Sequence, residues 1–132
     1  MTLRHAQEIS ANLERAEASL QAAKELFAKG FFDVVASRAY YAAFYAVTTL
    51  LLTEELEFNK HSGAIAAIHK RWIRTGRLHQ RYGKDLNWLF ELRNVGDYGV
   101  TLHVSQQDAK KAIRAAEAFL RIARSLIQER AE

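Results

Sequence analysis

The chain has 132 residues, of which 49% are hydrophobic and 26% are charged, and its formal net charge is +4. This composition predicts one folded domain over residues 1–132 and excludes a disordered chain. Cysteine is absent, which excludes disulfides and thiolate metal sites, and the longest uncharged stretch is shorter than the roughly 20 apolar residues that cross a bilayer. The N-terminus has no apolar signal segment, so we expect a cytoplasmic protein that does not bind membranes.

Proline is also absent, and long stretches of helix-forming residues predict an all-α fold. The first predicted helix ends at Gly30 and carries apolar residues at alternating spacings of three and four. These residues are Ala6, Ile9, Leu13, Ala16, Leu20, Ala23 and Phe27. Such a repeat is typical of a helix that packs in a bundle.

The second predicted helix starts at residues 31–33, reaches about Glu55 and is apolar nearly all round, which predicts a central position. Polar tips form a narrow row along it, at Asp33, Ser37, Tyr41, Tyr45 and Thr48. Most rows of this kind are satisfied core hydrogen bonds. Arg38 is the only cation in this helix, and we expect it to have a structural role, to pair with Asp33, or to join Arg93 at a shared site.

A shorter third helix is predicted from the turn at residues 59–63 to about Thr75, and Gly76 closes it. The segment from Lys60 to Lys84 contains no acidic residue and carries a charge of +7. Its basic residues are Lys60, Lys70, Arg71, Arg74, Arg77, Arg81 and Lys84. The remaining residues are slightly acidic in balance, so this basic segment predicts either a polyanionic partner or a solvated basic face.

The fourth predicted helix starts near Gln80 and breaks at Gly96, and a loop follows to about Val104. Ser105 and Asp108 resemble a capping box in front of a fifth helix, with aspartate where glutamate is usual. The fifth helix repeats the apolar spacing of the first. Together these elements predict an up-and-down bundle of four to five helices.

One arginine lies on the apolar face of the fourth helix. Leu86, Leu89, Phe90 and Arg93 follow the i, i+3, i+4, i+7 pattern, so the guanidinium points where a leucine is expected. A desolvated cation needs an anion or several acceptors, because an unpaired buried charge costs several kcal/mol. The simplest partner is Asp97, one turn further on, in an ordinary helix-end ion pair.

The neighbours of Arg93 favour a second interpretation, in which this segment contacts an anion or a nucleotide. Asn94 adds an amide, Asp97 a carboxylate and Tyr98 a phenol. The glycines at positions 96 and 99 are expected to let the backbone approach a ligand. Both interpretations of Arg93 remain open from the sequence.

Several other chemistries are disfavoured by spacing. His61 and His69 are eight residues apart, roughly 12 Å along a helix, which is too far for a shared ion. Ser62 follows His61, but no third group completes a hydrolase arrangement, and no glycine-rich phosphate loop occurs. We therefore expect no metal site and no cofactor.

Four sequence blocks stand out together. They are Arg38-Ala-Tyr-Tyr-Ala-Ala-Phe-Tyr45, Lys60-His-Ser-Gly63, Thr75-Gly-Arg-Leu78, and Leu92-Arg-Asn94 with Asp97-Tyr98. Over roughly residues 31–128 the chain resembles the small prokaryotic HEPN-domain proteins of the uncharacterised single-domain type. The resemblance implies a helical bundle that dimerises and is often encoded beside a minimal nucleotidyltransferase as a toxin and antitoxin pair.

Several members of that superfamily are metal-independent ribonucleases, with a signature of an arginine, usually a small polar residue, and a histidine after four to six intervening residues. The resemblance assigns Arg93 and Asn94 to the first half of this signature. Tyr98 stands where the histidine is expected, and a phenol with a pKa near 10 is only about one part in a thousand ionised at pH 7. His103 is the next imidazole, outside the family spacing, and it is a weaker candidate base that the loop would have to fold back.

We therefore predict a homodimer that binds RNA or a nucleotide and is the toxin-side partner of a minimal nucleotidyltransferase. The residues predicted to line its groove are Arg93, Asn94, Asp97 and Tyr98, supported by Arg38. The predicted phosphate contacts are Lys70, Arg71, Arg74, Arg77 and Arg81, and Trp72, Tyr82 and Trp88 are either stacking surfaces or core. Two alternatives remain: an active metal-independent endoribonuclease toxin with Tyr98 or His103 as base, and a non-catalytic assembly partner.

Overall fold

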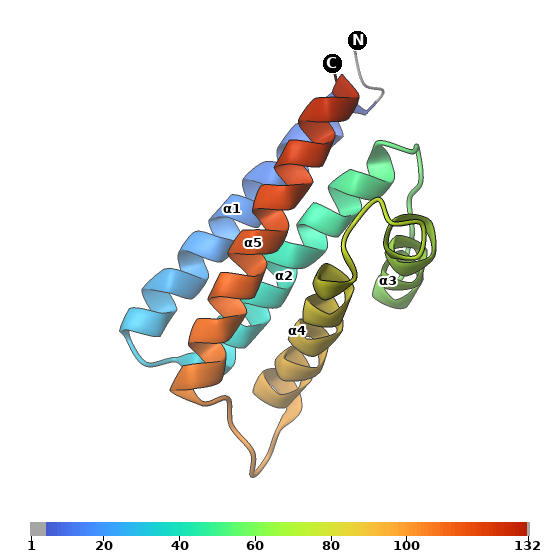
Figure 1. Cartoon of the computed structure of the whole chain (residues 1–132). Helices are drawn as coiled ribbons and strands as arrows, with labels where there is room; N and C mark the ends of the chain where they lie inside the picture. The colour runs from blue at the N-terminus through green and yellow to red at the C-terminus, as the bar shows by residue number, and fades with distance from the viewer. Residues whose placement is uncertain (1–4, 132) are drawn as a thin grey trace.

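The computed structural model of the chain describes residues 5–131, and in this part of the chain every regular element is helical (Figure 1). The four long helices lie alongside one another, while the short α3 and its π-helical continuation η1 pack against α2 and α4. The bounds are α1 (Ala6–Ala28), α2 (Phe32–Leu52), α3 (His61–Ile68), η1 (His69–Ile73), α4 (Gln80–Tyr98) and α5 (Gln106–Ala131). The predicted all-α bundle is confirmed.

Helix α2 is the central element, as its nearly continuous apolar sequence predicts. It packs against α1, α3, α4 and α5, and five of its alanines have no exposed surface. Small side chains let the neighbouring helices approach closely, and larger residues such as Tyr40 and Leu50 fill the space between them. Despite this apolar character, neither α2 nor any other helix within residues 5–131 is long and apolar enough to span a bilayer.

Two helix boundaries differ from the sequence prediction. The predicted third helix is α3 followed by the π-helical turn η1, in which the Arg74 N–H donates to the His69 carbonyl at 2.9 Å. Helix α4 does not break at Gly96 but continues to Tyr98. A glycine inside a helix is tolerated when packing compensates for its entropy cost, so glycine alone is an unreliable stop signal.

Gly96 lies where α4 meets the start of α2. A Cβ atom at this position would be 2.5 Å from the carbonyl oxygen of Asp33, and one at Gly99 would be equally close to the carbonyl oxygens of Val95 and Leu102. Both glycines therefore serve close packing of the chain against itself, and not the approach of a ligand that the sequence led us to expect. The contact at Gly96 brings Arg93, one turn earlier on α4, against the side of α2.

The loop after α4 ends at the predicted cap of α5. The Ser105 hydroxyl accepts a hydrogen bond from the Asp108 N–H at 3.0 Å, which confirms the N-cap half of the predicted capping box. The loop itself is tied to α2, because the Val104 N–H donates to the Asp33 carboxylate at 2.7 Å. The start of α2 thus holds the end of α4 and the entry to α5 together.

We predict that Gly96→Ala lowers the free energy of unfolding by about 1–3 kcal/mol, because the new methyl group meets fixed backbone on α2. Helix propensity alone favours alanine by up to about 1 kcal/mol, so any loss reports the clash. Gly83→Ala is the matched control on the same helix, since its Cβ would meet the His69 ring at 2.8 Å, a side chain that can rotate away. Equilibrium urea denaturation measures both variants, and an unchanged midpoint for Gly96→Ala would contradict the close-packing role.

Candidate functional site

Arg93 is held between α4 and two tyrosines of α2. Its side chain is only 16% exposed, and Nε donates to Asp97 Oδ2 at 2.9 Å while Nη2 donates to the Tyr41 hydroxyl at 3.1 Å. The guanidinium carbon lies 5.5 Å from the ring centres of both Tyr40 and Tyr41, which adds a cation–π attraction. The ordinary helix-end ion pair with Asp97 is present, but it accounts for only one side of the surroundings of Arg93.

Arg38 lies beside Tyr41, and both residues belong to α2. Its guanidinium carbon lies 5.3 Å from the Tyr41 ring centre, whereas Asp33 bonds to the loop before α5. Arg38 and Arg93 therefore both lie beside the Tyr41 ring, and Arg38 forms no ion pair with Asp33, while a binding site shared by the two arginines stays a prediction. Two guanidinium groups therefore converge on Tyr41, and Asp97 is the one carboxylate that forms an ion pair with either of them within residues 5–131.

A histidine outside the predicted site joins these residues. His61, the first residue of α3, places Nδ1 3.0 Å from the Tyr40 hydroxyl, stacks on Phe44 with ring centres 3.9 Å apart, and meets the Tyr41 ring edge-on at 5.7 Å. Burial, together with the positive charge of Arg93, lowers the pKa of His61 below its usual value. The imidazole of His61 and the guanidinium of Arg93 therefore both contact Tyr40 and Tyr41.

Spacing along the chain gives no reason to link His61 to Arg93, and the available signal was the Lys60-His-Ser-Gly63 block of the family resemblance. We refer to the assembled residues as the Arg93 site. They are Arg38, Tyr40, Tyr41, His61, Arg93 and Asp97.

Tyr98 and Asn94 flank the Arg93 site on α4. Tyr98 is the last residue of the helix and is 70% exposed, and its ring centre lies 5.9 Å from the guanidinium carbon of Arg93. Asn94 is half-buried beside Arg93. The structure thus brings Arg93, Asp97 and Tyr98 together at the C-terminal end of α4, where the phenol faces solvent.

His103 lies at Asp33 and not at Arg93. Its Nδ1 is 2.8 Å from Asp33 Oδ2, while the other carboxylate oxygen accepts from the Val104 N–H. Asp33 precedes Tyr41 by eight residues, about 12 Å along the axis of α2. The loop therefore does not fold this imidazole back to serve Arg93, because the carboxylate at the start of α2 holds it instead.

Two arginines of the basic segment form ion pairs with an acidic residue of the same chain. Arg77 Nη1 and Arg71 Nε lie 3.0 and 3.4 Å from the Glu54 carboxylate, and the Trp72 indole N–H donates to the same group at 2.8 Å. Burial acts to raise the pKa of Glu54, but donation from these three side chains outweighs it, and the pKa is lowered. Glu54 compensates the charge of Arg71 and Arg77, which weakens their predicted role as phosphate contacts.

The other predicted phosphate contacts lie away from Arg93. Lys70, Arg74 and Arg81 are exposed around the turn between η1 and the start of α4. Arg81 is twelve residues from Arg93 on one helix, roughly 18 Å along its axis. The basic segment and the Arg93 site are therefore separate surfaces, and the structure does not combine them into one groove.

The three candidate stacking residues belong mainly to the core. Trp72 is 1% exposed. Tyr82 and Trp88 are partly buried against the core cluster, where Tyr82 meets the Phe119 ring edge-on. Of the two interpretations of these aromatics, the structure supports the core one, most clearly for Trp72.

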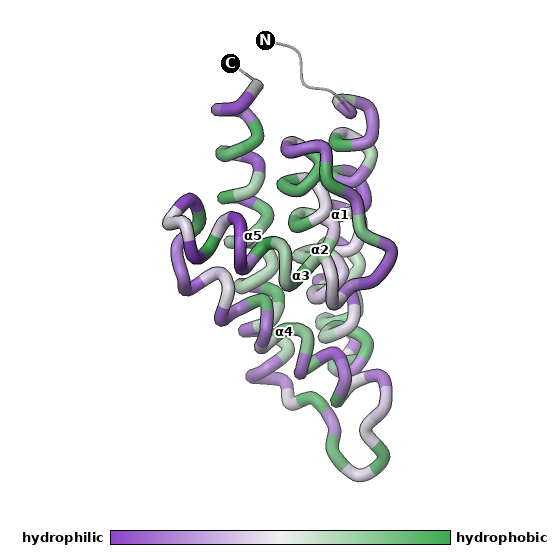
Figure 2. Tube along the Cα trace, turned by 90° about the vertical axis from the view of Figure 1, so that its right-hand side faces the viewer, coloured by the Kyte–Doolittle hydropathy of each residue, from purple (hydrophilic) through white to green (hydrophobic). Residues whose placement is uncertain are grey.

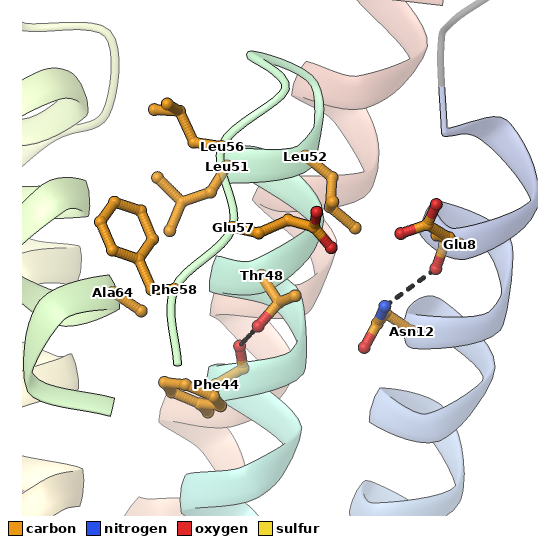
Figure 3. Close-up of a pocket in the computed structure, with 10 residues that line it drawn as sticks. All are labelled: Glu8, Asn12, Phe44, Thr48, Leu51, Leu52, Leu56, Glu57, Phe58 and Ala64. Atoms are coloured by element: carbon orange, nitrogen blue, oxygen red, sulfur yellow. Dashed lines mark hydrogen bonds between the residues drawn. The ribbon is translucent and has the colours of Figure 1, made fainter. Parts of the chain in front are cut away.

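Two hollows lie near the site. A cavity of about 130 Å³ between α1, α2 and the loop after α2 is lined by Phe44 and by the carboxylates of Glu8 and Glu57, which do not suit an anion (Figure 3). A shallow groove of about 370 Å³ between α3 and α4 includes Ser62 and Phe90, and it begins one residue after His61. Within residues 5–131, no cluster of three or more histidine or acidic side chains could hold a metal ion.

The chain belongs to the HEPN family, because the HEPN domain model matches residues 9–126. It is 39% identical over 115 residues to a UPF0332 protein of Thermotoga maritima, with 87% of each chain covered. It is 34% identical over 120 residues to a Methanocaldococcus jannaschii protein named "putative toxin", covering 91% of this chain and 82% of that one. A UPF0332 protein of Gloeobacter violaceus is 39% identical over 118 residues, covering 89% and 94%. The family resemblance stated from the sequence blocks is confirmed.

Asp33 gives the fold a testable pH dependence. Donation from the Val104 N–H, helped by His103, lowers the pKa of Asp33 below its usual value of 3.8. A carboxylate with a lowered pKa stabilises the folded state at pH values above the usual one, and this contribution is lost as the pH falls through the folded-state pKa. We predict that Asp33→Asn is less stable than the wild type at pH 7 by about 1 kcal/mol and that the difference shrinks below about pH 4.

Urea denaturation at pH 7 and pH 3 measures this difference. His103→Ala is the control, because it keeps the Val104 bond to Asp33 and should have the smaller effect. A difference between the wild type and Asp33→Asn that is the same at both pH values would contradict the role of the carboxylate.

Proposed function

We propose that the Arg93 site binds a phosphate group of RNA and that the chain acts as the toxin-side component of a toxin and antitoxin pair. The observation that carries the proposal is the convergence of Arg38 and Arg93 on Tyr41, where Asp97 pairs with Arg93 and, within residues 5–131, Arg38 forms no ion pair. Two guanidinium groups and one carboxylate leave a net positive site, which an anion from outside can complete. Two Methanocaldococcus jannaschii relatives that carry the name "putative toxin" support the toxin role.

The surroundings of the two arginines suit phosphate recognition. Tyr40 has no exposed surface and Tyr41 is half-buried, so the charges sit against apolar rings where electrostatic attraction is stronger than in water. A planar guanidinium matches the geometry of phosphate oxygens better than an ammonium does. The separate basic segment, through Lys70, Arg74 and Arg81, would add a general attraction for a longer RNA.

We predict that Arg38→Ala weakens binding of a fluorescein-labelled single-stranded RNA by at least roughly tenfold, since a charge-assisted contact is lost. Arg93→Ala should weaken it as much, but this side chain also ties α4 to α2, so circular dichroism must show that the variant is folded. Arg124→Ala is the control, because Arg124 lies on α5 and pairs with Glu17 of α1. Fluorescence anisotropy measures the affinity, and equal affinities for Arg38→Ala and Arg124→Ala would contradict the proposed site.

The same samples test the alternative of an active ribonuclease. We expect binding without turnover, because the family's histidine is replaced by Tyr98 and His103 lies at Asp33. The RNA is incubated with protein in the presence of a chelator and analysed on a gel. Cleavage that is lost in Arg93→Ala would favour the enzyme, with Tyr98 or His103 as its candidate base.

We also propose a homodimer formed at the end of the bundle where α2 begins. Several large apolar side chains are exposed there, and Figure 2 shows hydrophobic segments in the loop that projects below α4. These side chains are Phe31, Val34, Tyr98, Val100 and Leu102. Covering them with a second copy would remove apolar surface from water and bring the exposed Tyr98 beside the partner.

We predict that Val100→Asp combined with Leu102→Asp converts the dimer to a monomer, because charged groups then replace the most exposed apolar side chains of the loop. Size-exclusion chromatography with light scattering measures the mass. Gln107→Asp is the control, since it adds a charge at an exposed position at the start of α5. A wild-type protein that is monomeric at micromolar concentration would contradict the proposed dimer.

The antitoxin-side partner that we propose is a minimal nucleotidyltransferase. Support comes from the resemblance to HEPN proteins that are encoded beside such enzymes, together with the toxin names of two relatives. Co-expression with the product of the adjacent reading frame, followed by affinity purification, tests the pair. If instead the chain binds that protein but no RNA, the assembly-partner alternative is favoured.

A further inference from the structure

The Tyr40 hydroxyl has one place to donate its proton. Tyr40 has no exposed surface, so water does not reach the hydroxyl, and within residues 5–131 its hydrogen-bond partner is His61 Nδ1 at 3.0 Å. Burial raises the pKa of Tyr40 to about 12, so the phenol keeps its proton at neutral pH. A buried O–H without an acceptor is costly, and donation to His61 Nδ1 avoids this cost.

This donation selects one tautomer of His61. An imidazole that accepts at Nδ1 carries its own proton at Nε2, because neutral histidine has one donor and one acceptor nitrogen. Protonating Nδ1 as well would force the Tyr40 hydroxyl to accept and leave its proton without a partner. The buried side of His61 therefore favours a neutral ring whose Nε2–H is available as a donor.

The charges around His61 also favour the neutral form of its imidazole. The titratable and charged groups that face it are Tyr40 and Tyr41 of α2 and Arg93 of α4. The guanidinium disfavours a second positive charge on the imidazole, and no carboxylate of residues 5–131 forms an ion pair with His61 to offset it. The half-buried imidazole of His61 thus remains neutral beside the guanidinium of Arg93, and both groups contact Tyr40 and Tyr41.

We propose that His61, held by Tyr40 as the Nε2–H tautomer, donates a neutral hydrogen bond to a phosphate oxygen of the RNA at the Arg93 site. This inference rests on the proposed RNA binding and adds a ligand-contacting residue from α3. It assigns His61 a donor role and not that of a general base, because Nε2 already carries a proton and Nδ1 is occupied by Tyr40. The site then contributes two guanidinium groups and one neutral donor to a single anion.

Long-range proton–nitrogen NMR of the full chain at pH 7 tests the tautomer. We expect a protonated Nε2 and an unprotonated Nδ1 for His61, and a shift of the Nε2–H resonance when inorganic phosphate is added. Tyr40→Phe removes the selecting hydroxyl and should produce a mixture of tautomers. A His61 that carries its proton on Nδ1 in the wild type would overturn the assignment.

RNA binding by two His61 variants tests the donor role. His61→Ala should weaken binding of the labelled RNA roughly tenfold, whereas His61→Gln, whose amide can donate from a position near Nε2, should retain most of the affinity. The affinity of the wild type should be nearly independent of pH between 6.5 and 8, since a neutral donor takes up no proton. His69→Gln is the matched control, because His69 bonds to Asn87 of α4 at 3.0 Å and lies eight residues further along the chain.

The outcomes separate this inference from the proposed function. If Arg38→Ala weakens binding and His61→Ala does not, the donor role fails while the RNA site stands. If His61→Gln loses as much affinity as His61→Ala, or if binding strengthens steeply as the pH falls through 6.5, a charged imidazole is required and the neutral donor is wrong. A wild-type protein that binds neither RNA nor phosphate overturns both proposals.

Discussion

The contact between Arg93 and the paired tyrosines of α2 is the interaction on which the candidate site depends. Placing a guanidinium on the apolar face of α4 is expensive unless acceptors surround it, and Asp97, the Tyr41 hydroxyl and two aromatic rings provide them. The close approach of the two helices at Gly96 makes this possible. A larger residue at position 96 would move Arg93 away from Tyr40 and Tyr41, and the contacts that offset the cost of burying its charge would be lost.

The chain separates its positive charge into two parts with different surroundings. In the basic segment, Arg71 and Arg77 both pair with Glu54, so a dense run of cations in the sequence is partly neutralised by one acidic residue in the turn after α2. The Arg93 site also has two arginines and one carboxylate, but Asp97 pairs with Arg93 alone, and within residues 5–131 Arg38 forms no ion pair. The Arg93 site is the better candidate for an external anion, because the charge of Arg38 is not compensated by an ion pair there, whereas Arg71 and Arg77 both pair with Glu54.

Membership of the HEPN family describes the fold of the chain, while its chemistry depends on which side chains the fold brings together. The histidine expected after four to six intervening residues from Arg93 is absent, yet an imidazole is present at the same tyrosines, contributed by α3. Its contact with Tyr40 favours a neutral donor, which suits phosphate binding better than proton abstraction. The proposed preference for binding over turnover has this physical basis.

By itself the sequence determined the helices, the bundle and the position of Arg93 with Asp97 one turn away, because spacings within one helix follow from its pitch. Only the tertiary structure decided that Arg38 and His61 lie at the tyrosines that contact Arg93. It also decided that His103 bonds to Asp33 and that Glu54 forms ion pairs with two of the arginines predicted to bind phosphate. These contacts cross from one element to another, and they depend on how closely and at what register the helices pack, which the spacing of residues along the chain does not specify.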